Sequence, residues 1–197
     1  IRDDFAKAYS ERFVWTDYGT ELGEFLSVNI IQTAEGITID SERYITDMAA
    51  EFFPGGVHAA YELPSTEQLT KLVKEAATAK VVPEQALLHR FDSLVMKELF
   101  VSTVTRPEVA WSVAMLSRVL AYPTAELMLA AERIAIYLYK HRALKIKYEP
   151  SGVNVRGAWA PRASVAEGVT EGLSDASFEI AHSTSGYVYL FAMAAIA

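Results

Sequence analysis

Apolar residues recur every three or four positions between residues 65 and 140, and this spacing is the strongest constraint on the fold. It is the period of one buried face of an α-helix. Pro83 and Pro107 suit first helical turns, and Thr124 is placed to cap the last helix. Ser65–Gln68 has the spacing of a capping box. The sequence therefore predicts a helical bundle over residues 65–140.

Strand-like patterns lie on both sides of this bundle. Residues 25–31 and 37–39 are rich in β-branched residues and flank a turn that contains Gly36, which predicts a β-hairpin. After the bundle, apolar residues alternate with lysine at Leu144–Tyr148, which is typical of a strand. Further strands are predicted at residues 153–159, 169–178 and 186–191.

Two more helices are predicted before the bundle, at residues 3–13 and from Asp40 or Ser41 to Phe52. The second should end at the Pro54–Gly56 segment. The chain is therefore expected to be an α+β protein. It would have a short α/β piece with a hairpin, a central helical bundle and C-terminal strands.

Composition restricts the chemistry and the compartment. The chain has no cysteine, which excludes disulfides, cysteine-based zinc sites, iron–sulfur clusters and thiol catalysis. This fits a reducing intracellular compartment: cytoplasm, nucleus or an organelle interior. The longest apolar stretch, residues 186–197, is too short for a membrane-spanning helix. The four histidines are widely separated, and no standard catalytic or cofactor-binding signature is present, so neither a metal nor another cofactor is expected.

The charge distribution argues against strong nucleic-acid binding. The net charge is −7, and residues 1–60 hold eleven acids against four bases. The rest of the chain is balanced, and no basic stripe is visible of the kind that a phosphate backbone attracts. We expect the chain alone to bind nucleic acid weakly or not at all.

The segment Thr105–Arg118, TRPEVAWSVAMLSR, resembles TRPDIAYAVxxLSR of copia-type retrotransposon Pol polyproteins. Four other blocks resemble the same family and follow in its order. They are Asp17–Leu26, Ile39–Ile45, Pro123–Leu138 and the pair Leu173–Phe178 (LSDASF) and Ser183–Phe191 (STSGYVYLF). Five short blocks in order are far more specific than any one of them.

The resemblance implies a division of the chain into three parts. Residues 1–60 would be the end of the reverse transcriptase palm and the start of the thumb. Residues 61–140 would be the helical thumb and connection. Residues 141–197 would be the opening strands of a truncated ribonuclease H domain. Within this frame Arg106 and Arg118 are candidate nucleic-acid contacts.

The resemblance also indicates which catalytic groups are missing. Asp175 matches the first metal-binding carboxylate of the family's ribonuclease H, but the other acids and the polymerase YVDD loop fall outside this chain. A single carboxylate does not hold two divalent ions against phosphate. Asp175 is therefore expected to be a remnant, and Mg²⁺ would matter only within an intact polymerase or nuclease. The family's HW and K are Leu127-Met128 and Glu132 here.

Two functional hypotheses follow. The first is a non-catalytic derivative or fragment that serves as a structural or binding subunit of a larger assembly of proteins. The alternative is a working part of a retrotransposon RNA-directed DNA polymerase and ribonuclease H whose catalytic residues lie outside this chain. An incomplete sheet leaves edges that pair with other chains, so the first hypothesis predicts a partner interface at the C-terminal end. Its residues would be Tyr187, Tyr189, Phe191 and Ile196. The other possibility is that this tail folds back over the helical bundle.

Overall fold

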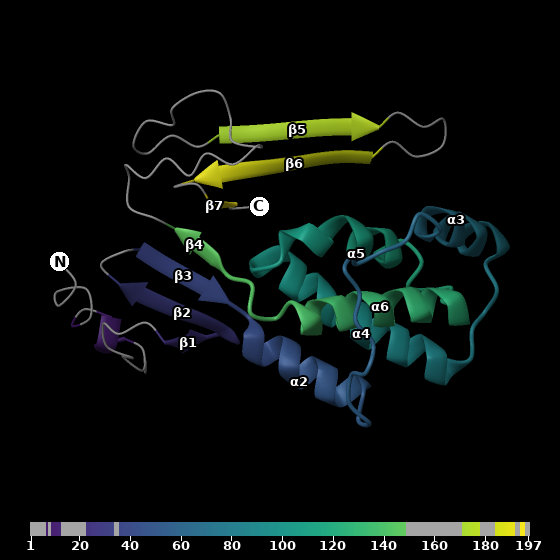
Figure 1. The fold of residues 1–197 in the computed structure, drawn as a ribbon, viewed down its shortest axis with the longest axis horizontal. Helices are drawn as coiled ribbons and strands as arrows, with labels where there is room; N and C mark the ends of the chain where they lie inside the picture. The colour runs from purple at the N-terminus through teal and green to yellow at the C-terminus, as the bar shows by residue number, and fades with distance from the viewer. Residues whose placement is uncertain are drawn as a thin grey trace.

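The computed structural model combines helices with antiparallel sheets (Figure 1). It describes residues 7, 9–12, 23–33 and 36–148, together with the backbone of residues 171–177, 184–191 and 194–195. The predicted strand at 153–159 and most of the predicted helix at 3–13 lie outside these ranges. The expected mixed α and β character is confirmed.

The first sheet has four antiparallel strands in the order β1-β2-β3-β4. The predicted hairpin is present as β2 (Val28–Thr33) and β3 (Gly36–Asp40). The strand predicted over residues 25–31 is wrong in its first part: Phe25 belongs to a separate short strand, β1 (Glu24–Phe25), and residues 26–27 form the turn between β1 and β2. The turn between β1 and β2 places Leu26 and Ser27 at φ 48° and 63°. Two-residue hairpin turns with positive φ at both positions normally use glycine or asparagine. Because Leu26 and Ser27 are neither, the sequence did not indicate a turn here.

The fourth strand, β4 (Ile146–Tyr148), comes from the far side of the helical part of the chain. It pairs antiparallel with β3, with Ile146 opposite Ile39 and Tyr148 opposite Ile37. The predicted alternating strand is therefore confirmed. Its partner is the N-terminal hairpin, so the chain returns to the first sheet after leaving it at Asp40.

Helices fill the chain between β3 and β4, and α4 and α6 run through the middle of the body in Figure 1. They are α2 (Glu42–Phe52), α3 (Leu69–Ala79), α4 (Gln85–Val104), the short 3₁₀ helix η1 (Pro107–Val109), α5 (Ala110–Ser117) and α6 (Ala125–Lys140). The apolar stripe predicted for α6 is buried along its whole length, from Leu127 to Leu138. The predicted helical bundle over residues 65–140 is confirmed.

The helix starts predicted at Thr124, at Asp40 and at Pro107 are present. Those predicted at Ser65 and Pro83 are not, and Pro83 lies outside α4, which begins at Gln85. The Thr124 hydroxyl accepts a hydrogen bond from the Leu127 N–H at 3.3 Å, as predicted. At α2, Asp40 rather than Ser41 supplies the side-chain oxygen, which accepts from the Glu42 N–H at 3.2 Å. The capping box predicted at Ser65 is wrong, because α3 begins only at Leu69 and the Ser65 hydroxyl bonds to Ser112 instead.

A second antiparallel sheet lies near the C-terminus in the order β5-β6-β7. Its strands are β5 (Glu171–Ser177), β6 (Thr184–Phe191) and β7 (Ala194–Ala195). The strands predicted at 169–178 and 186–191 are thus present. Three such strands do not distinguish a ribonuclease H-like sheet from other antiparallel sheets, so that assignment stays a prediction.

Candidate functional site

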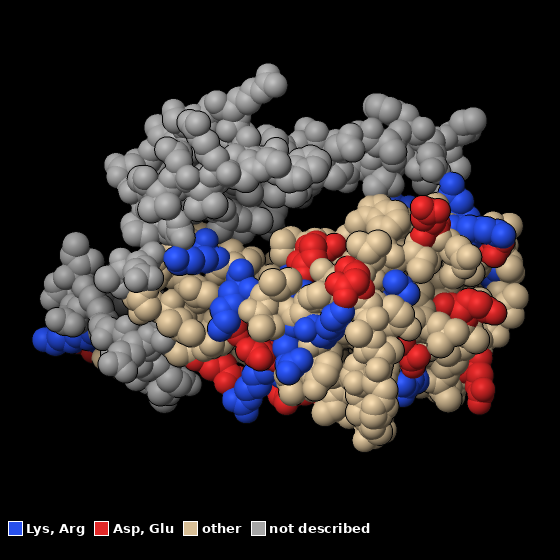
Figure 2. Space-filling model, in the orientation of Figure 1, with Lys and Arg blue, Asp and Glu red and all other residues tan. Residues whose placement is uncertain are grey.

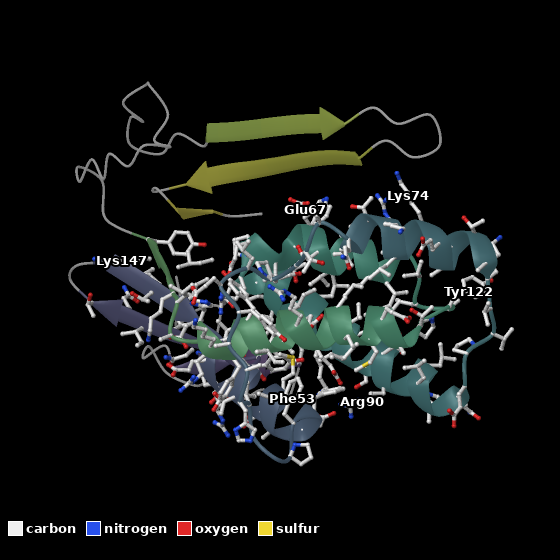
Figure 3. The ribbon with its side chains drawn as sticks, turned by 45° about the vertical axis from the view of Figure 1, so that its right-hand side comes forward. Phe53, Glu67, Lys74, Arg90, Tyr122 and Lys147 are labelled. Atoms are coloured by element: carbon white, nitrogen blue, oxygen red, sulfur yellow. The ribbon has the colours of Figure 1, made fainter. Side chains whose placement is uncertain are left out.

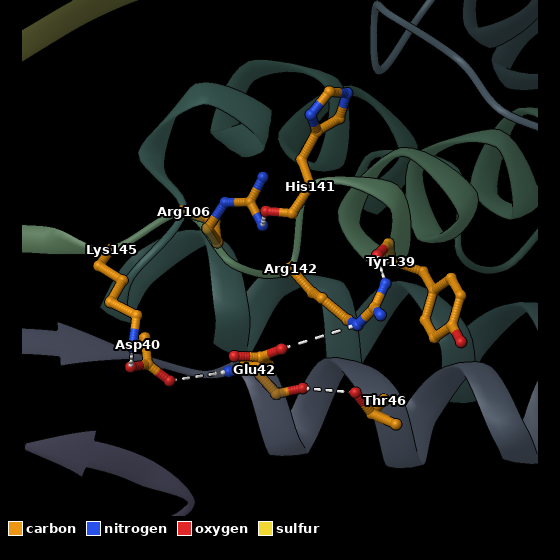
Figure 4. A network of polar contacts seen from close by, with 8 residues as sticks. All are labelled: Asp40, Glu42, Thr46, Arg106, Tyr139, His141, Arg142 and Lys145. Atoms are coloured by element: carbon orange, nitrogen blue, oxygen red, sulfur yellow. Dashed lines mark hydrogen bonds and ion pairs between the residues drawn. The ribbon is translucent and has the colours of Figure 1, made fainter.

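Arg106 lies inside the protein at the junction between α4 and η1, and its side chain is only 1% exposed. Its Nε donates to Glu108 Oε1 at 2.6 Å, and its Nη1 donates to the carbonyl oxygen of His141 at 3.0 Å (Figure 4). The guanidinium carbon lies 5.9 Å from the centre of the Tyr137 ring. Among the described residues, Nη2 finds no hydrogen-bond acceptor. A buried guanidinium with two internal acceptors fixes the end of α6 against the start of η1.

His141 extends this network beyond the end of α6. Its ring packs against Tyr137, with 4.6 Å between the ring centres. Its Nε2 lies 3.3 Å from the carbonyl oxygen of Tyr61. A carbonyl oxygen only accepts, so this nitrogen carries the proton. One histidine thus joins α6 to Arg106 through its backbone and to the segment around Tyr61 through its ring.

Several apolar residues of the Thr105–Arg118 motif belong to the hydrophobic core. Val109, Val113 and Leu116 are fully buried in the core. The Thr105 hydroxyl donates to the Ser41 hydroxyl at 2.9 Å and so links the motif to the start of α2. Arg118, at the other end of the motif, is exposed. Arg106 and Arg118 therefore do not form one surface, and a nucleic-acid contact through Arg106 would require its internal network to open.

Asp40 forms a second polar centre where β3 meets α2. Its carboxylate pairs with Lys145 at 2.9 Å and accepts from the Glu42 N–H at 3.2 Å (Figure 4). It also accepts from the Asn29 side chain at 3.2 Å. Burial alone would raise the pKa of Asp40, but these three donors together hold it below its ordinary value. The same ion pair raises the pKa of Lys145. Lys145 directly precedes β4, so this pair helps to bring β4 beside β3.

Basic side chains near the end of α6 are paired with acids rather than gathered into a patch. Lys140 contacts Glu62, and Arg142 lies 3.7 Å from Glu42 while packing over the Tyr139 ring. Together with Arg106 and Lys145, each of these bases has an acidic neighbour. The face shown in Figure 2 accordingly has blue and red side chains interleaved. This arrangement leaves little unbalanced positive charge for a phosphate backbone to engage.

The positions that depart from the family pattern have structural roles. Leu127 and Met128 are buried in the core. Glu132 accepts a hydrogen bond from Arg90 at 3.1 Å, and Arg90 also donates to the carbonyl oxygen of Phe52 at 3.0 Å. Figure 3 shows Arg90 on the same side of the molecule as Phe53, which ends α2. The acid at position 132 thus fixes the side chain that closes the C-terminus of α2.

Glu98 is an acidic residue that pattern analysis missed, because it occupies a helix face otherwise made of apolar side chains. It lies on α4, is fully buried, and neither carboxyl oxygen has a hydrogen-bond partner among the described residues. Burial raises the pKa of Glu98 well above its ordinary value, opposed only by the backbone of Ala135 on α6. Burial between α4 and α6 therefore favours the neutral form of Glu98.

The remaining predicted site residues lie near the C-terminus. Asp175 is in β5, opposite Gly186 of β6. Tyr187, Tyr189 and Phe191 follow along β6, whereas Ile196 lies outside the described residues. Their proposed roles stay predictions, as do those of Arg106 and Arg118.

The described residues contain neither a metal-binding cluster nor a membrane-spanning helix. No three histidine, aspartate or glutamate side chains there lie close enough together to hold a metal ion. No helix in that part of the chain has the length and apolar character needed to cross a bilayer.

Comparison with known proteins gave one informative match. The chain is 28% identical over all of its 197 residues to a Saccharomyces cerevisiae protein named "Putative transposon Ty5-1 protein". It spans 57% of the length of that protein. No family model and no solved structure matched. The similarity covers the Arg106 junction and both sheets, and it supports a retrotransposon-derived origin for this chain.

Proposed function

We propose that this chain is a non-catalytic structural segment, derived from a copia-type reverse transcriptase and ribonuclease H polyprotein, that serves as a subunit of a larger assembly. Residues 1–60 would be the end of the palm and the start of the thumb. Residues 61–140 would be the thumb and connection helices, and residues 141–197 the truncated ribonuclease H strands. The supporting match is end-to-end similarity to a transposon protein.

The observation that carries the proposal is the burial of the family motif. Thr105, Arg106 and Val109 are almost completely enclosed. The Thr105 hydroxyl bonds to Ser41, and two of the three Arg106 guanidinium nitrogens bond to Glu108 and His141. Residues used in this way maintain an architecture and do not touch a substrate. Four bases near the end of α6 and β4 are likewise occupied by acids.

The C-terminal sheet supports the assembly part of the proposal. β7 pairs only with Leu190 and Phe191 of β6. Among the described strands, the same edge of β6 is therefore uncovered from Thr184 to Tyr189. An uncovered strand edge pairs readily with a strand of another chain. We place the partner interface on this edge, with Tyr187 and Tyr189 as contact residues.

The first test is catalytic. The isolated chain should neither extend a primer nor cut an RNA–DNA hybrid in the presence of Mg²⁺ or Mn²⁺. Turnover that is abolished by Asp175→Asn would overturn the non-catalytic assignment and favour an active polymerase or nuclease segment. Asp175→Asn should leave the circular dichroism spectrum and the size of any complex unchanged.

The second test concerns assembly. Sedimentation of the full chain is compared with that of a chain lacking residues 186–197. The full chain should associate, with itself or with a co-purifying protein, and the deletion should abolish this while the helical body keeps its circular dichroism signal. A full chain that remains monomeric and uncomplexed at high concentration contradicts the assembly proposal.

A further inference from the structure

The segment between α2 and α3, residues 54–68, crosses the helical body without forming a helix or strand (Figure 1). We call it the strap. It runs past the C-terminal half of α6, and its two ends continue into helices that are packed in the core. A segment of this length without regular structure must be held by its side chains and carbonyl groups.

The contacts that hold the strap come mainly from basic side chains of α6. The Arg133 guanidinium stacks on the Tyr61 ring at 4.0 Å, and its Nε donates to the Leu63 carbonyl oxygen at 3.2 Å. Lys140 forms an ion pair with Glu62. Residues 61–63 of the strap are therefore held by two cations that lie about two turns apart on α6. His141, just after α6, bonds to the Tyr61 carbonyl oxygen.

Burial of apolar side chains contributes little to this attachment. No residue from 54 to 68 is classed as buried, and Leu63 is 65% exposed. The flanking helices differ, since Phe52 and Leu69 are both in the core. Contacts between partly exposed charges are weakened by salt, whereas apolar packing is not. The strap and the helices on either side of it should thus respond differently to ionic strength.

The strap covers a polar part of α5 at its end nearest α3. Ser112 of α5 is only 2% exposed, and its hydroxyl donates to the Ser65 hydroxyl at 2.9 Å. This hydroxyl is a suitable reporter position for the strap, because its hydrogen-bond partner, Ser65, belongs to the strap.

We propose that the strap is an electrostatic latch, which opens as a unit when the cations of α6 lose their contacts, while the helical body stays folded. Opening uncovers Ser112 and frees Arg133 and Lys140 from their contacts with the strap. Closed, the strap pairs Glu62 with Lys140 and offers the Leu63 carbonyl oxygen to Arg133. The latch concerns access to α6 and stands independently of the function proposed above.

The absence of cysteine makes the latch measurable with a single introduced thiol. Ser112→Cys reports strap opening through its rate of alkylation by iodoacetamide, a neutral reagent. Ser102→Cys is the matched reference, because Ser102 is 4% exposed within α4 and is bonded inside that helix. Both rates are divided by that of Thr78→Cys, which lies on the exposed face of α3. After this normalisation, the rate at position 112 reports opening under the strap, and the rate at position 102 reports opening of the core.

Adding Glu62→Gln should speed alkylation of Ser112→Cys by about three- to fivefold. Raising the salt to 1 M, where the Debye length is about 3 Å, should also speed it. Ser102→Cys should not respond to either change. Glu75→Gln, which removes an exposed ion pair with Lys71 on α3, is the control and should have no effect.

Equal acceleration at positions 112 and 102 would mean global opening. No acceleration at 112 would mean that Glu62 does not hold the strap. Either result overturns the latch.

Discussion

The guanidinium of Arg106 donates to the backbone carbonyl oxygen of His141, 35 residues further along the chain, at 3.0 Å. The carbonyl groups at the end of a helix lack partners within the helix, and His141 follows the last residue of α6. Arg106 shares one of these groups, the His141 carbonyl, with the Leu144 N–H. The bond ties the family-like motif to the end of the buried stripe of α6.

Replacing Arg106 by Lys should destabilise the fold by about 2–4 kcal/mol, because an ammonium group does not reach Glu108 and His141 with the same fork geometry. Urea unfolding followed by circular dichroism measures the change. Arg118→Lys is the matched control at the exposed end of the motif and should change the free energy of unfolding by less than about 0.5 kcal/mol. Equal effects of the two substitutions would show that Arg106 is not a structural clamp.

Glu98→Gln should make the protein more stable, and the gain should grow with pH. The raised pKa of Glu98 means that the folded state holds a proton that the unfolded state releases above about pH 4.3. The stability of the parent therefore falls as pH rises from that value through the raised pKa of the folded state. At pH 8 the variant should exceed the parent by on the order of 1–3 kcal/mol.

The measurement for Glu98 is a series of urea titrations between pH 4 and pH 8. Glu75→Gln, an exposed substitution on α3, provides the reference slope. A constant difference between Glu98→Gln and the parent across this range would contradict a buried, protonated carboxyl group.

Asp40→Asn should destabilise the protein at neutral pH by about 1–3 kcal/mol, because it leaves Lys145 without its partner beside β4. The pKa of Asp40 is lowered in the folded state. The parent's advantage should therefore be complete above about pH 3.9, the unfolded value, and disappear as pH falls through the folded value. Thermal unfolding at several pH values tests this. Asp47→Asn, an exposed acid on α2, should cost far less.

Binding of the chain to an RNA–DNA hybrid should be weak and should disappear by about 0.2 M salt. Arg106, Lys140, Arg142 and Lys145 are each beside an acid, so each of these four must give up its ion pair before it can displace a counterion. Fluorescence anisotropy over a salt series gives the number of phosphate contacts from its slope. Tight binding at 0.2 M would show that these pairs exchange their acids for phosphates.

Elements with a regular period could be predicted from the sequence. The α6 stripe from Leu127 to Leu138 and the hairpin around Gly36 are both present, because burial of one face imposes a repeat that the residues display. The cap at Thr124 could also be predicted, because its hydrogen bond joins two residues only three positions apart in the sequence.

Contacts between residues far apart in the sequence could not be predicted in the same way. The Ser65 hydroxyl could cap a local helix or bond to a distant residue, and in the structure it bonds to Ser112. The burial of Arg106 gives no sequence signal, since a lone arginine after a helix resembles any surface base. The same holds for Glu98, whose neutral state depends on the helices packed around it. The partner of β4 was also hidden, because alternation predicts a strand and does not name its neighbour.

The pairing of Ile146 with Ile39 means that the polypeptide enters and leaves its helical part at adjacent points of one sheet. The helices α2 to α6 are thus one long insertion between β3 and β4, two strands that are neighbours in the sheet. Bringing the ends of so long a loop together is slow unless the intervening chain is already compact. Loop closure therefore favours assembly of the helices before β4 pairs with β3. The ribosome also synthesises β4 after all of these helices, so the order of translation and the order that loop closure favours coincide.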